Sequence, residues 1–503
     1  MEDYLLGIDI GTSACKLALF KTSGEVVAQK SGGYKVYYPH KGWAEQQPEE
    51  WWEVVASTLQ ALIKENNINA TSIKGIGVDG QSWSAIALDR EGKVLCPTPI
   101  WMDTRANALC EELKKEINEE EIFKVCGNPL EPSYTLPKIL WYKKHRPEVY
   151  EKTHAILQSN SFIVYKLTGK MSQDKSQGYG YQCFDMHNGT WDKKLCRTFG
   201  IEERILPPIY DCHQVVGHVT EEAAQVTGLK VGTPVVAGGL DAACGTLGAG
   251  VIHNGQTQEQ GGQAGGMSIC TDTYRADKQL ILSYHVVPNR WLLQGGTVGG
   301  GGTIRWFEEQ FGEAERQLAR EKGTHSFEEM SREAEAIEAG AEGLVFLPYM
   351  AGERSPIWNP KAKGVYFGLD FAKTRAHLIR ATFEGVAYSL KHNLDIAENV
   401  GAHVEELHAM GGAANSHVWT QIKADVTGKK ISVPASDTAT TLGAALLAGV
   451  GVGLYKDFEE AVEQTVAIKR IHLPNRANSE SYKHYYEIYI KLYSQLKDLM
   501  EEL

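Results

Sequence analysis

Residues 5–20 read LLGIDIGTSACKLALF, and this stretch decides the fold that we expect. The apolar LLGIDI predicts a strand, DIGTS has the composition of a tight turn, and KLALF continues as a second strand. Further along, residues 234–250 read PVVAGGLDAACGTLGAG, where a buried strand runs into an aspartate among small residues. The two glycine-rich turns, at Asp9 and Asp241, indicate two related α/β halves.

The composition is that of a globular chain with a mildly acidic balance. Its 503 residues include 51 Lys and Arg against 63 Asp and Glu, a net charge of −12, and 43% are hydrophobic. This length allows about two to four domains and excludes a small module. The composition argues against a chain that is largely disordered or membrane-embedded. The negative charge gives no electrostatic reason to expect nucleic acid or anionic lipid as a partner, although local phosphate sites stay compatible with it.

The cysteines and the N-terminus indicate the compartment. Nine cysteines lie at irregular spacing without any Cys-x-x-Cys, which predicts free thiols in a reducing environment. Glu2 and Asp3 stand where a signal peptide would carry basic residues. The most apolar stretch, 234–252, contains Asp241 and several glycines, so we predict no membrane-spanning helix. We expect a cytoplasmic protein.

Periodicity predicts further elements. Residues 73–88 read as strands on either side of DGQS, and 137–145 as a helix with proline at its start. Residues 479–503 predict a C-terminal helix whose tyrosines serve packing. Apolar residues recur at helical spacing in a further segment, at Ile379, Phe383, Val386, Leu390 and Leu394. The C-terminal helix should bury one face made of Tyr485, Ile488, Leu492, Leu496 and Leu499. A glycine cluster places the domain boundary at 246/247, giving an N-terminal domain 1–246 and a C-terminal domain 247–503.

The first turn could bind phosphate. Exposed amides at Gly11, Thr12 and Ser13 could hold phosphate oxygens while the Asp9 carboxylate organises Mg²⁺. Lys16 could add positive charge or be a solvated strand residue. The alternative is an ordinary hairpin with an Asx turn. Because no G-x-x-x-x-G-K-[ST] occurs, a P-loop fold is unsupported.

The aspartate of the second turn could accept a proton. Asp241 ends an apolar strand among small residues, which leaves room for a substrate hydroxyl. Phosphoryl transfer to an alcohol needs such a base. The alternative role is a helix N-cap.

Glycine loops in the second half favour a nucleotide cleft. They occupy 261–266, 295–303 and 411–415, and each permits close approach of a ligand to the backbone. No G-x-G-x-x-G opens a βαβ unit with a spaced acid, so a dinucleotide site is disfavoured.

Two segments of the first half could recognise a sugar. Residues 101–105, WMDTR, and residues 80–83, GQSW, supply carboxylate, amide, guanidinium and indole groups for a polyhydroxylated ligand. Structural roles for the tryptophan and the Asp–Arg pair are the alternative. The sequence has neither HExxH nor G-x-S-x-G, so a catalytic zinc and the usual hydrolase signature are unsupported.

Eight motifs occur together and in order: LLGIDIGTSACKLALF, GWAEQQPEEWW, IWMDTR, LPKILW, VVAGGLDAACGTLGAG, LPYMAGERSP, NPKAKGVYFGL and MGGAANSHVW. With them the chain resembles the FGGY carbohydrate kinases, and among these the xylulokinases, from about residue 4 to about residue 475. The resemblance implies two α/β domains of the ribonuclease-H type, as in actin, sugar kinases and heat-shock chaperone ATPases, facing across a cleft. It implies ATP and Mg²⁺ as cofactors, with ATP mainly on the second domain and the sugar mainly on the first. A homodimer is compatible with it.

The resemblance also implies roles for single residues. Asp9 would organise Mg²⁺ together with Asp241, and Asp241 would deprotonate the sugar hydroxyl that attacks the γ-phosphate. Sugar-binding residues would be Gly80, Gln81, Ser82, Trp83, Asp103, Arg105 and Asp241. Residues on ATP and its phosphates would be Gly11, Thr12, Ser13, Lys16, Gly262, Gly265, Gly301, Gly411, Gly412 and Asn415.

Three departures from the bacterial xylulokinase pattern bear on the substrate. Trp83 replaces a sugar-contacting histidine, and Ala242 replaces an asparagine that often follows the catalytic aspartate. The second phosphate loop, residues 262–265, reads GQAG without the usual hydroxyls. The changes at Trp83 and Ala242 fall at substrate positions, so they weaken the case for xylulose but not for a kinase. From Asp9, Asp241 and the ordered motifs we expect a kinase for a small sugar, such as the ketopentose D-xylulose, acting on a terminal hydroxyl. A kinase for another ketose, polyol, sugar acid or sugar-like signal is the alternative, and a catalytically weak sensor of sugar or nucleotide is a further one.

Overall fold

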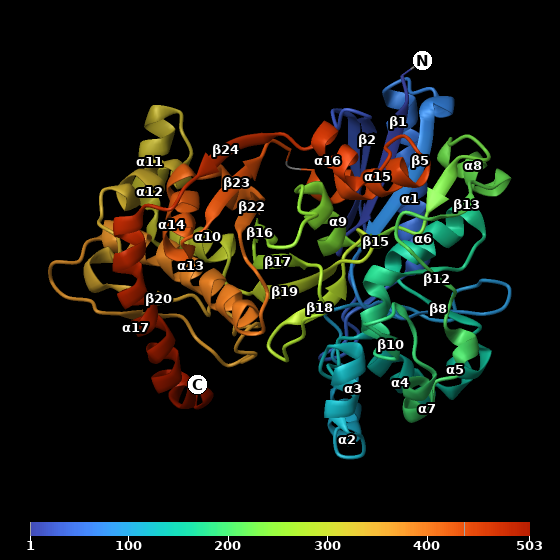
Figure 1. The fold of residues 1–503 in the computed structure, drawn as a ribbon, viewed down its shortest axis with the longest axis horizontal. Helices are drawn as coiled ribbons and strands as arrows, with labels where there is room; N and C mark the ends of the chain where they lie inside the picture. Colours follow the sequence, from blue (N-terminus) through green and yellow to red (C-terminus); the bar gives the residue numbers. More distant parts are fainter. Residues whose placement is uncertain (1, 437) are drawn as a thin grey trace.

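Two mixed seven-stranded sheets organise the computed structural model, which describes residues 2–436 and 438–503 (Figure 1). The first sheet has the order β13-β14-β5-β1-β2-β3, with β15 beside β5. Its strands are β1 Tyr4–Ile10, β2 Ala14–Lys21, β3 Val26–Gly33, β5 Ile73–Gly80, β13 Val215–His218, β14 Pro234–Val236 and β15 Gly239–Leu240. The second sheet has the order β18-β19-β17-β16-β22-β23-β24. Its strands are β16 Gln256–Gly261, β17 Gly265–Thr271, β18 Ile281–Tyr284, β19 Trp291–Thr297, β22 Glu406–Met410, β23 Lys430–Pro434 and β24 Ile468–His472.

The two sheets share one pairing pattern. β1 pairs antiparallel with β2 and parallel with β5, and β2 pairs antiparallel with β3. In the second sheet β16 pairs antiparallel with β17 and parallel with β22, and β17 pairs antiparallel with β19. The predicted strand–turn–strand unit at 5–20 and the prediction of two α/β halves are confirmed. The counterpart of the first hairpin is β16–β17, whereas β14 and β15 lead directly into helix α9 (Asp241–Gly248).

Helices cover both faces of the first sheet. On one side lie α1 (Pro48–Glu65), α6 (Ser159–Thr168) and α8 (Glu221–Thr227). On the other side α15 (Ala439–Gly451) packs on β1 and β5 and against α9. The approach is close because the strands carry glycine: a Cβ at Gly7 would overlap the carbonyl of Thr441, and one at Gly77 that of Ala444. Figure 1 shows α15 and α16 (Phe458–Thr465), coloured red, beside the blue strands of the first sheet.

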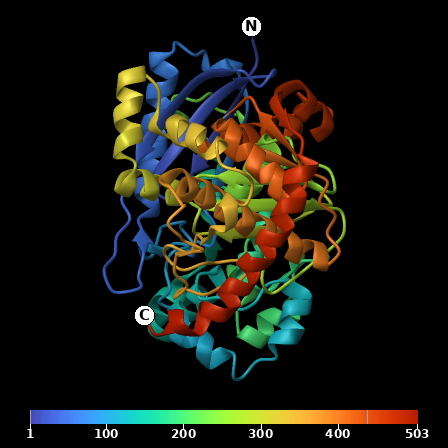
Figure 2. The same cartoon turned by 90° about the vertical axis from the view of Figure 1, so that its left-hand side faces the viewer.

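The second sheet is covered by helices from its own half. α13 (Arg375–Asn399) packs on β17 and β19, and α14 (His417–Thr427) on β23 and β24. α17 (Arg476–Glu501) packs against α13 and α14 and runs lengthwise across this lobe (Figure 2). The outer helices are α10 (Gly301–Phe311), α11 (Glu313–Lys322) and α12 (Ser326–Glu335). α13 confirms the helix predicted from the spacing of apolar residues.

The C-terminal helix confirms the packing role of its tyrosines. Tyr482 and Tyr489 are each 1% exposed, and the Tyr349 hydroxyl donates to that of Tyr489 at 2.7 Å. The predicted buried face is wrong at Leu499, which is 59% exposed near the end of the helix.

Residues 85–158 and 169–212 build a small, mostly helical region below the first sheet, as seen in Figure 1. Its helices are α2 Asn107–Leu113, α3 Glu119–Cys126, α4 Thr135–His145, α5 Pro147–Lys152 and α7 Lys193–Phe199, and its strands β6 Ile86–Leu88 and β8 Ala155–Leu157 pair with each other. The predicted strands around DGQS are β5 and β6. The helix predicted for 137–145 is confirmed as α4, which begins two residues before Pro137.

The chain passes between the two sheets three times. It leaves the first sheet after α9, returns to it at α15 and α16, and goes back to the second sheet at β24. A proposed division at 246/247 therefore assigns α15 and α16 to the C-terminal domain by sequence, although they pack on the first sheet.

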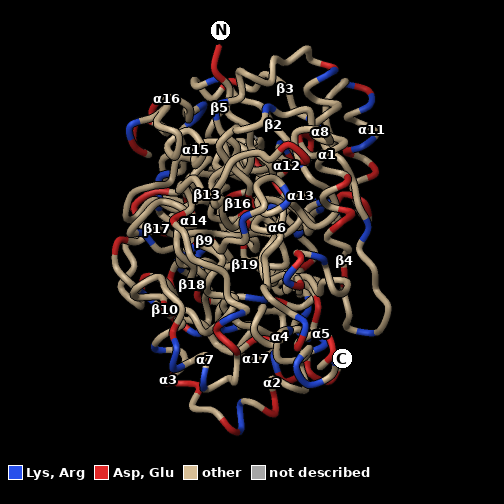
Figure 3. The backbone as a smooth tube through the Cα atoms, turned by 90° about the vertical axis from the view of Figure 1, so that its right-hand side faces the viewer, with Lys and Arg blue, Asp and Glu red and all other residues tan. Residues whose placement is uncertain are grey.

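The surface carries both signs of charge. Figure 3 shows acidic and basic residues interspersed along the outer helices and loops. Within residues 2–436 and 438–503, no helix has the length and apolarity needed to cross a bilayer.

Candidate active site

Asp9 and Asp241 line one cleft between the two halves. Its volume is about 330 Å³, and Gly11 and Lys16 line it from the first hairpin. From the second half come Gln258, Gln260, Met410, Gly411, Ala439 and Thr440. Asp9 lies at the end of β1, and Asp241 is the first residue of α9. The fold thus brings together two carboxylates that are far apart in sequence.

The environment of these carboxylates favours their neutral forms. Burial raises the pKa of Asp241 to about 7, and the negative charge of Asp9 adds to this effect. Burial also raises the pKa of Asp9, although the Lys16 ammonium, 3.8 Å away, opposes the shift. Asp241 accepts a hydrogen bond at 2.6 Å from the Ala242 amide, which lies at the start of α9. A carboxylate with a pKa near neutrality is suited to taking up a proton.

A third carboxyl group, that of Asp79, escaped the sequence interpretation. Asp79 lies opposite Asp9 in the parallel register of β1 and β5, and opposite Gly239 in that of β15 and β5. It is fully buried, and neither carboxyl oxygen accepts a hydrogen bond from a described donor. Burial, followed by the charges of Asp9 and Asp241, raises its pKa well above the ordinary value. The sequence signal was present, because Val78-Asp79-Gly80 repeats the apolar–acid pattern of the first strand.

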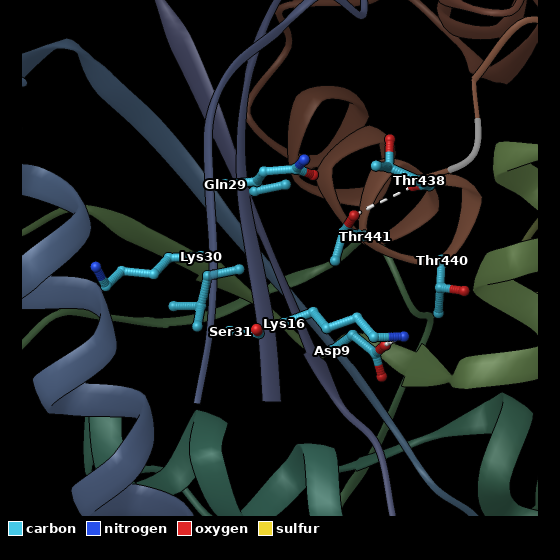
Figure 4. A pocket seen from close by; sticks show the side chains of 10 residues that line it. Asp9, Lys16, Gln29, Lys30, Ser31, Thr438, Thr440 and Thr441 are labelled. Atoms are coloured by element: carbon cyan, nitrogen blue, oxygen red, sulfur yellow. Dashed lines mark hydrogen bonds and ion pairs between the residues drawn. The ribbon is translucent and has the colours of Figure 1, made fainter. Parts of the chain in front are cut away.

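The first turn has hydroxyls and amides beside the cleft. The Thr12 hydroxyl accepts a hydrogen bond from the Trp101 indole at 3.0 Å, and Ser13 is exposed. Lys16 also lines a second hollow of about 320 Å³ between the first hairpin and α15. Figure 4 shows Asp9 and Lys16 side by side in this hollow, with Thr440 facing them from α15. The side chain of Lys16 is 69% exposed, so its ammonium is free to meet an anion.

Three glycine segments of the second half lie together. The Gly301 amide donates to the Gly262 carbonyl at 2.8 Å, which places the start of α10 on the β16–β17 turn. Gly411, with φ +82°, lies so close to Gly261 that a Cβ would be 2.8 Å from its carbonyl oxygen. Gly412 and Asn415 are exposed on the same loop. Gly265 instead lines a separate, smaller cavity with Glu259 and Lys423.

The predicted sugar loop begins at the same edge of the sheet. Gly80 is opposite Leu240, which precedes Asp241, so the loop after β5 and the start of α9 leave the sheet together. The Gln81 side-chain amide donates to Gln46 at 2.8 Å, and its own oxygen has no described partner. Ser82 and Trp83 are partly exposed. The Trp83 indole packs on Tyr134 and Tyr179, with ring centroids 4.7 and 6.2 Å away.

Asp103 and Arg105 form a buried ion pair behind the cleft. Asp103 is fully buried and accepts hydrogen bonds from the Ala44 amide and from the backbone and guanidinium of Arg105, at 2.7–3.0 Å. Arg105 also donates to Glu45 at 2.7 Å and lies 3.8 Å from the centre of the Trp43 ring. In this structure the pair is engaged with protein groups on all sides, which favours the structural alternative.

The remaining cleft residues could not be read from local patterns. Gln258 and Thr440 come from β16 and α15, and only the fold brings them to Asp9. Tyr134 and Tyr179 are each 2% exposed and resemble ordinary core aromatics in the sequence.

The donor set fits a magnesium ion that is shared with a nucleotide. No three His, Cys, Asp or Glu side chains in the described parts of the chain are grouped as a metal site. Mg²⁺ in phosphoryl-transfer sites is held by one or two carboxylates, with phosphate and water completing its shell. Asp9 and Asp241, facing one cleft, match that requirement.

The chain matches known proteins over nearly its whole length. The model for the N-terminal domain of the FGGY family of carbohydrate kinases matches residues 4–248, and the model for the C-terminal domain matches residues 266–452. A xylulose kinase of Staphylococcus epidermidis is 32% identical over 506 residues, covering 100% of this chain and 99% of that protein. A gluconokinase of Bacillus subtilis is 31% identical over 512 residues, with 100% and 99% covered.

The structural comparison agrees with these matches. The crystal structure of a xylulose kinase from Rhodospirillum rubrum superimposes with a TM-score of 0.90 at 30% identity, over 99% of this chain and 100% of that one. The expected fold, two actin-like α/β halves facing across a cleft, is confirmed. By the family models, the sequence relatives and the shared structure, the chain belongs to the FGGY family of carbohydrate kinases.

Proposed function

We propose that this kinase transfers the γ-phosphate of ATP to a terminal hydroxyl of a small neutral sugar, with a ketopentose such as D-xylulose as the first candidate. One observation carries the proposal: Asp9 and Asp241 face a single cleft whose opposite wall contains the glycine segment at Gly411. The xylulose kinases among the relatives support the choice of sugar.

In the proposed reaction Asp241 is the general base. Its carboxylate takes the proton of the sugar hydroxyl while the hydroxyl oxygen forms a bond to the γ-phosphorus. The bond from that phosphorus to the bridging oxygen breaks, and ADP leaves with the electron pair. Amides of the turn at Gly11, Thr12 and Ser13, with the ammonium of Lys16, bind phosphate oxygens on one side. The loops at Gly262, Gly301 and Gly411 to Asn415 bind the nucleotide on the other.

Asp9, with Asp241, would hold Mg²⁺ in this site. When bound, Mg²⁺ neutralises phosphate charge and orients the transferred group. Asp9 contributes by its fixed position at the end of β1, where the β1–β5 pairing and the Lys16 ion pair hold its carboxylate at the cleft. The sugar side comprises Gly80, Gln81, Ser82 and Trp83.

The charges around the sugar loops favour a neutral substrate over a sugar acid. A carboxylate ligand would require a free cation, because burying an unpaired charge is costly. Two cations at these loops are already engaged: Arg105 with Asp103 and Glu45, and Lys138 with three backbone carbonyls. This argues for a ketose or polyol, although gluconokinases are also among the relatives.

The nine unpaired cysteines fit a reducing compartment, and we propose that the enzyme acts in the cytoplasm.

The test is ADP release from Mg-ATP with a panel of ketopentoses, ketotetroses, polyols, aldonates and hexoses, together with a blank without sugar. Selective turnover on a neutral ketose supports the proposal, and turnover only on aldonates overturns the neutral-substrate argument. Binding of ATP without turnover on any sugar would favour a sensor instead.

The variant Asp241→Asn tests the proposed base. We expect turnover to fall by about 10²–10⁴-fold, the usual contribution of a general base. Stabilisation of the fold by Mg-ATP, measured as a thermal shift, should persist. A variant that keeps more than a tenth of the activity contradicts the role of Asp241.

A further inference from the structure

A buried lysine connects the loops around the proposed sugar site. Lys138 lies in α4 and is fully buried. Its ammonium donates to the carbonyls of Trp83 at 2.7 Å, Ile100 at 2.7 Å and Ser133 at 2.6 Å. Burial lowers the pKa of Lys138 to about 7, and in the protonated form each of its three protons meets a carbonyl. Since burying a charge is costly unless it is hydrogen-bonded, the three loops that supply these carbonyls are held at fixed distances from one another.

Each of the three carbonyls belongs to Trp83 or directly precedes a residue that contacts the first turn or the Trp83 ring. Ile100 precedes Trp101, whose indole donates to Thr12 in the first turn. Ser133 precedes Tyr134, whose ring packs on Trp83. The carbonyl of Trp83 is itself the third acceptor. One ammonium therefore fixes an indole on the phosphate side and the aromatic rings on the sugar side.

Trp83 has a conformation that needs such support. Its φ is +63°, in the left-handed region that a bulky residue rarely adopts because its Cβ crowds the backbone there. Its ring lies over Gly180, where a Cβ would be only 2.8 Å from the indole Cδ1. The hydrogen bond from Lys138 on one side and the missing side chain of Gly180 on the other hold the indole in place.

The resulting aromatic wall adjoins Asp241. The Trp83 ring packs on Tyr134 and Tyr179, and burial together with the nearby charge of Asp241 raises the pKa of the Tyr179 hydroxyl. Tyr134 and Tyr179 meet edge to face, with centroids 6.0 Å apart. Apolar faces of this kind accept the C–H face of a sugar, while the neighbouring polar groups bind its hydroxyls.

We propose that Lys138 is a positioning residue for substrate recognition: its contacts with three loop carbonyls hold Trp83, seated over Gly180, in the orientation that shapes the sugar side of the cleft. This role rests on the proposed function in one respect, that the substrate occupies the space beside this wall. Lys138 acts through Trp83 and takes no part in the transfer of the phosphoryl group.

Lys138→Met keeps the length of the side chain and removes the three hydrogen bonds. We expect the KM for the sugar to rise about tenfold or more, since lost hydrogen bonds to buried groups cost about 1–3 kcal/mol. The KM for ATP should rise less than the KM for the sugar, because most of the proposed nucleotide-binding groups lie in the other half and Trp101 reaches the first turn only through the Thr12 hydroxyl. Lys143→Met is the matched control: Lys143 is on the same helix, is exposed, and donates only to the Gly200 carbonyl. An equal rise of both KM values would reduce Lys138 to a structural role and overturn the proposal.

The variant Gly180→Ala disturbs Trp83 from the side opposite Lys138. It tests the proposal if Lys138→Met does not fold. Its Cβ should displace the indole and raise the KM for the sugar in the same way. Gly33→Ala is its control, because a Cβ there makes only an ordinary contact of 3.7 Å. An unchanged KM for the sugar in Gly180→Ala would overturn the proposal.

A readout independent of turnover separates this proposal from the proposed function. The chain is labelled with 5-fluorotryptophan, and the ¹⁹F resonance of Trp83 is assigned with Trp83→Phe. Lys138→Met and Gly180→Ala should shift that resonance and leave the resonance of Trp291 unchanged, whereas both controls leave all resonances in place. A Trp83 resonance that does not move overturns the positioning role. Displacement in both variants without turnover of any sugar by the parent protein supports the positioning of Trp83 and counts against the proposed function.

Discussion

The Asp241 carboxyl combines burial with a negative neighbour, and this sets the pH at which it can accept a proton. The groups that face it are Asp9, Asp79 and, more distantly, Lys16, and burial with Asp9 raises its pKa to about 7. A general base acts only when deprotonated, so kcat/KM should rise with pH through about 7 and level off above it. Below that point we expect a loss of about tenfold per pH unit. Steady-state kinetics between pH 5.5 and 8.5 measure this. A flat profile in that range, with ATP binding constant, would contradict the assignment of the base.

Asp79 tests how the environment of one buried carboxyl group affects the stability of the fold. The Asp79 carboxyl has no described N–H or O–H partner and faces the carboxyl groups of Asp9 and Asp241, so a neutral amide that can donate to Asp9 relieves the repulsion, which is worth about 1–3 kcal/mol. We therefore expect Asp79→Asn to raise the free energy of unfolding, as measured by urea denaturation.

The control for this prediction is Asp174→Asn. Asp174 is equally buried but accepts hydrogen bonds from Asn160, Gln173, Ser176 and the Gln177 amide. Its substitution should lower the free energy of unfolding by about 1–3 kcal/mol. If both variants shift stability in the same direction, the unpartnered state of Asp79 does not explain its effect.

Single residues could be predicted where the sequence pattern of a strand identifies them. Asp9 and Asp241 follow apolar residues and precede small ones, so the sequence predicts that they lie at the ends of strands. Asp79 follows the same pattern and could have been predicted in the same way. The burial of Arg105 could not be anticipated, because it depends on Glu45, 60 residues away, and on the Trp43 ring.

Among the elements, α15 depends most on the small residues beneath it. A Cβ on Gly77 would overlap the carbonyl of Ala444, and a helix backbone cannot yield as a side chain does. We expect Gly77→Ala to lower the free energy of unfolding by about 3 kcal/mol or more. Gly75→Ala, on the same strand, should cost less because its nearest neighbours are side-chain atoms at 3.1 and 3.2 Å. Thermal unfolding of the two variants measures the difference. Equal losses would show that the helix can shift on the sheet.

The predictability of elements followed their sequence patterns. α13 was predicted because its apolar residues recur at helical spacing among polar ones such as Arg380 and Glu384, although residues 379–390 are all buried. α15 was not, since nearly its whole surface is buried and its sequence lacks a polar stripe. Leu499 has the spacing of the buried face of α17, but at this end of the helix Met500, which is 4% exposed, lies on the packed face instead.

For the whole molecule we expect closure on ligands. The candidate groups lie on both halves, and phosphoryl transfer requires them to approach and exclude water. Small-angle X-ray scattering should show a smaller radius of gyration with sugar and a non-hydrolysable ATP analogue than without ligand. The ATP analogue alone serves as the control and should give a smaller change. A radius that is equal in all three states would contradict closure.

At this scale the sequence indicated two α/β halves, through two glycine-and-acid turns and the ordered motifs. The return of α15 to the first sheet has no local signal in the sequence, because it depends on the topology of the whole chain. The association state also has none, and a homodimer stays a prediction for light scattering.

The three passages of the chain between the two sheets have a mechanical consequence. A single tether would let one half swing and twist freely against the other. The three connections lie side by side, since the Ala435 amide donates to the Ala467 carbonyl at 2.8 Å and Gly250 adjoins Val466. They form one narrow junction, which leaves rotation about that junction as the main easy motion. The two halves would then meet in the same register at every closure, so that Asp9 and Asp241 return to the same place relative to Gly411.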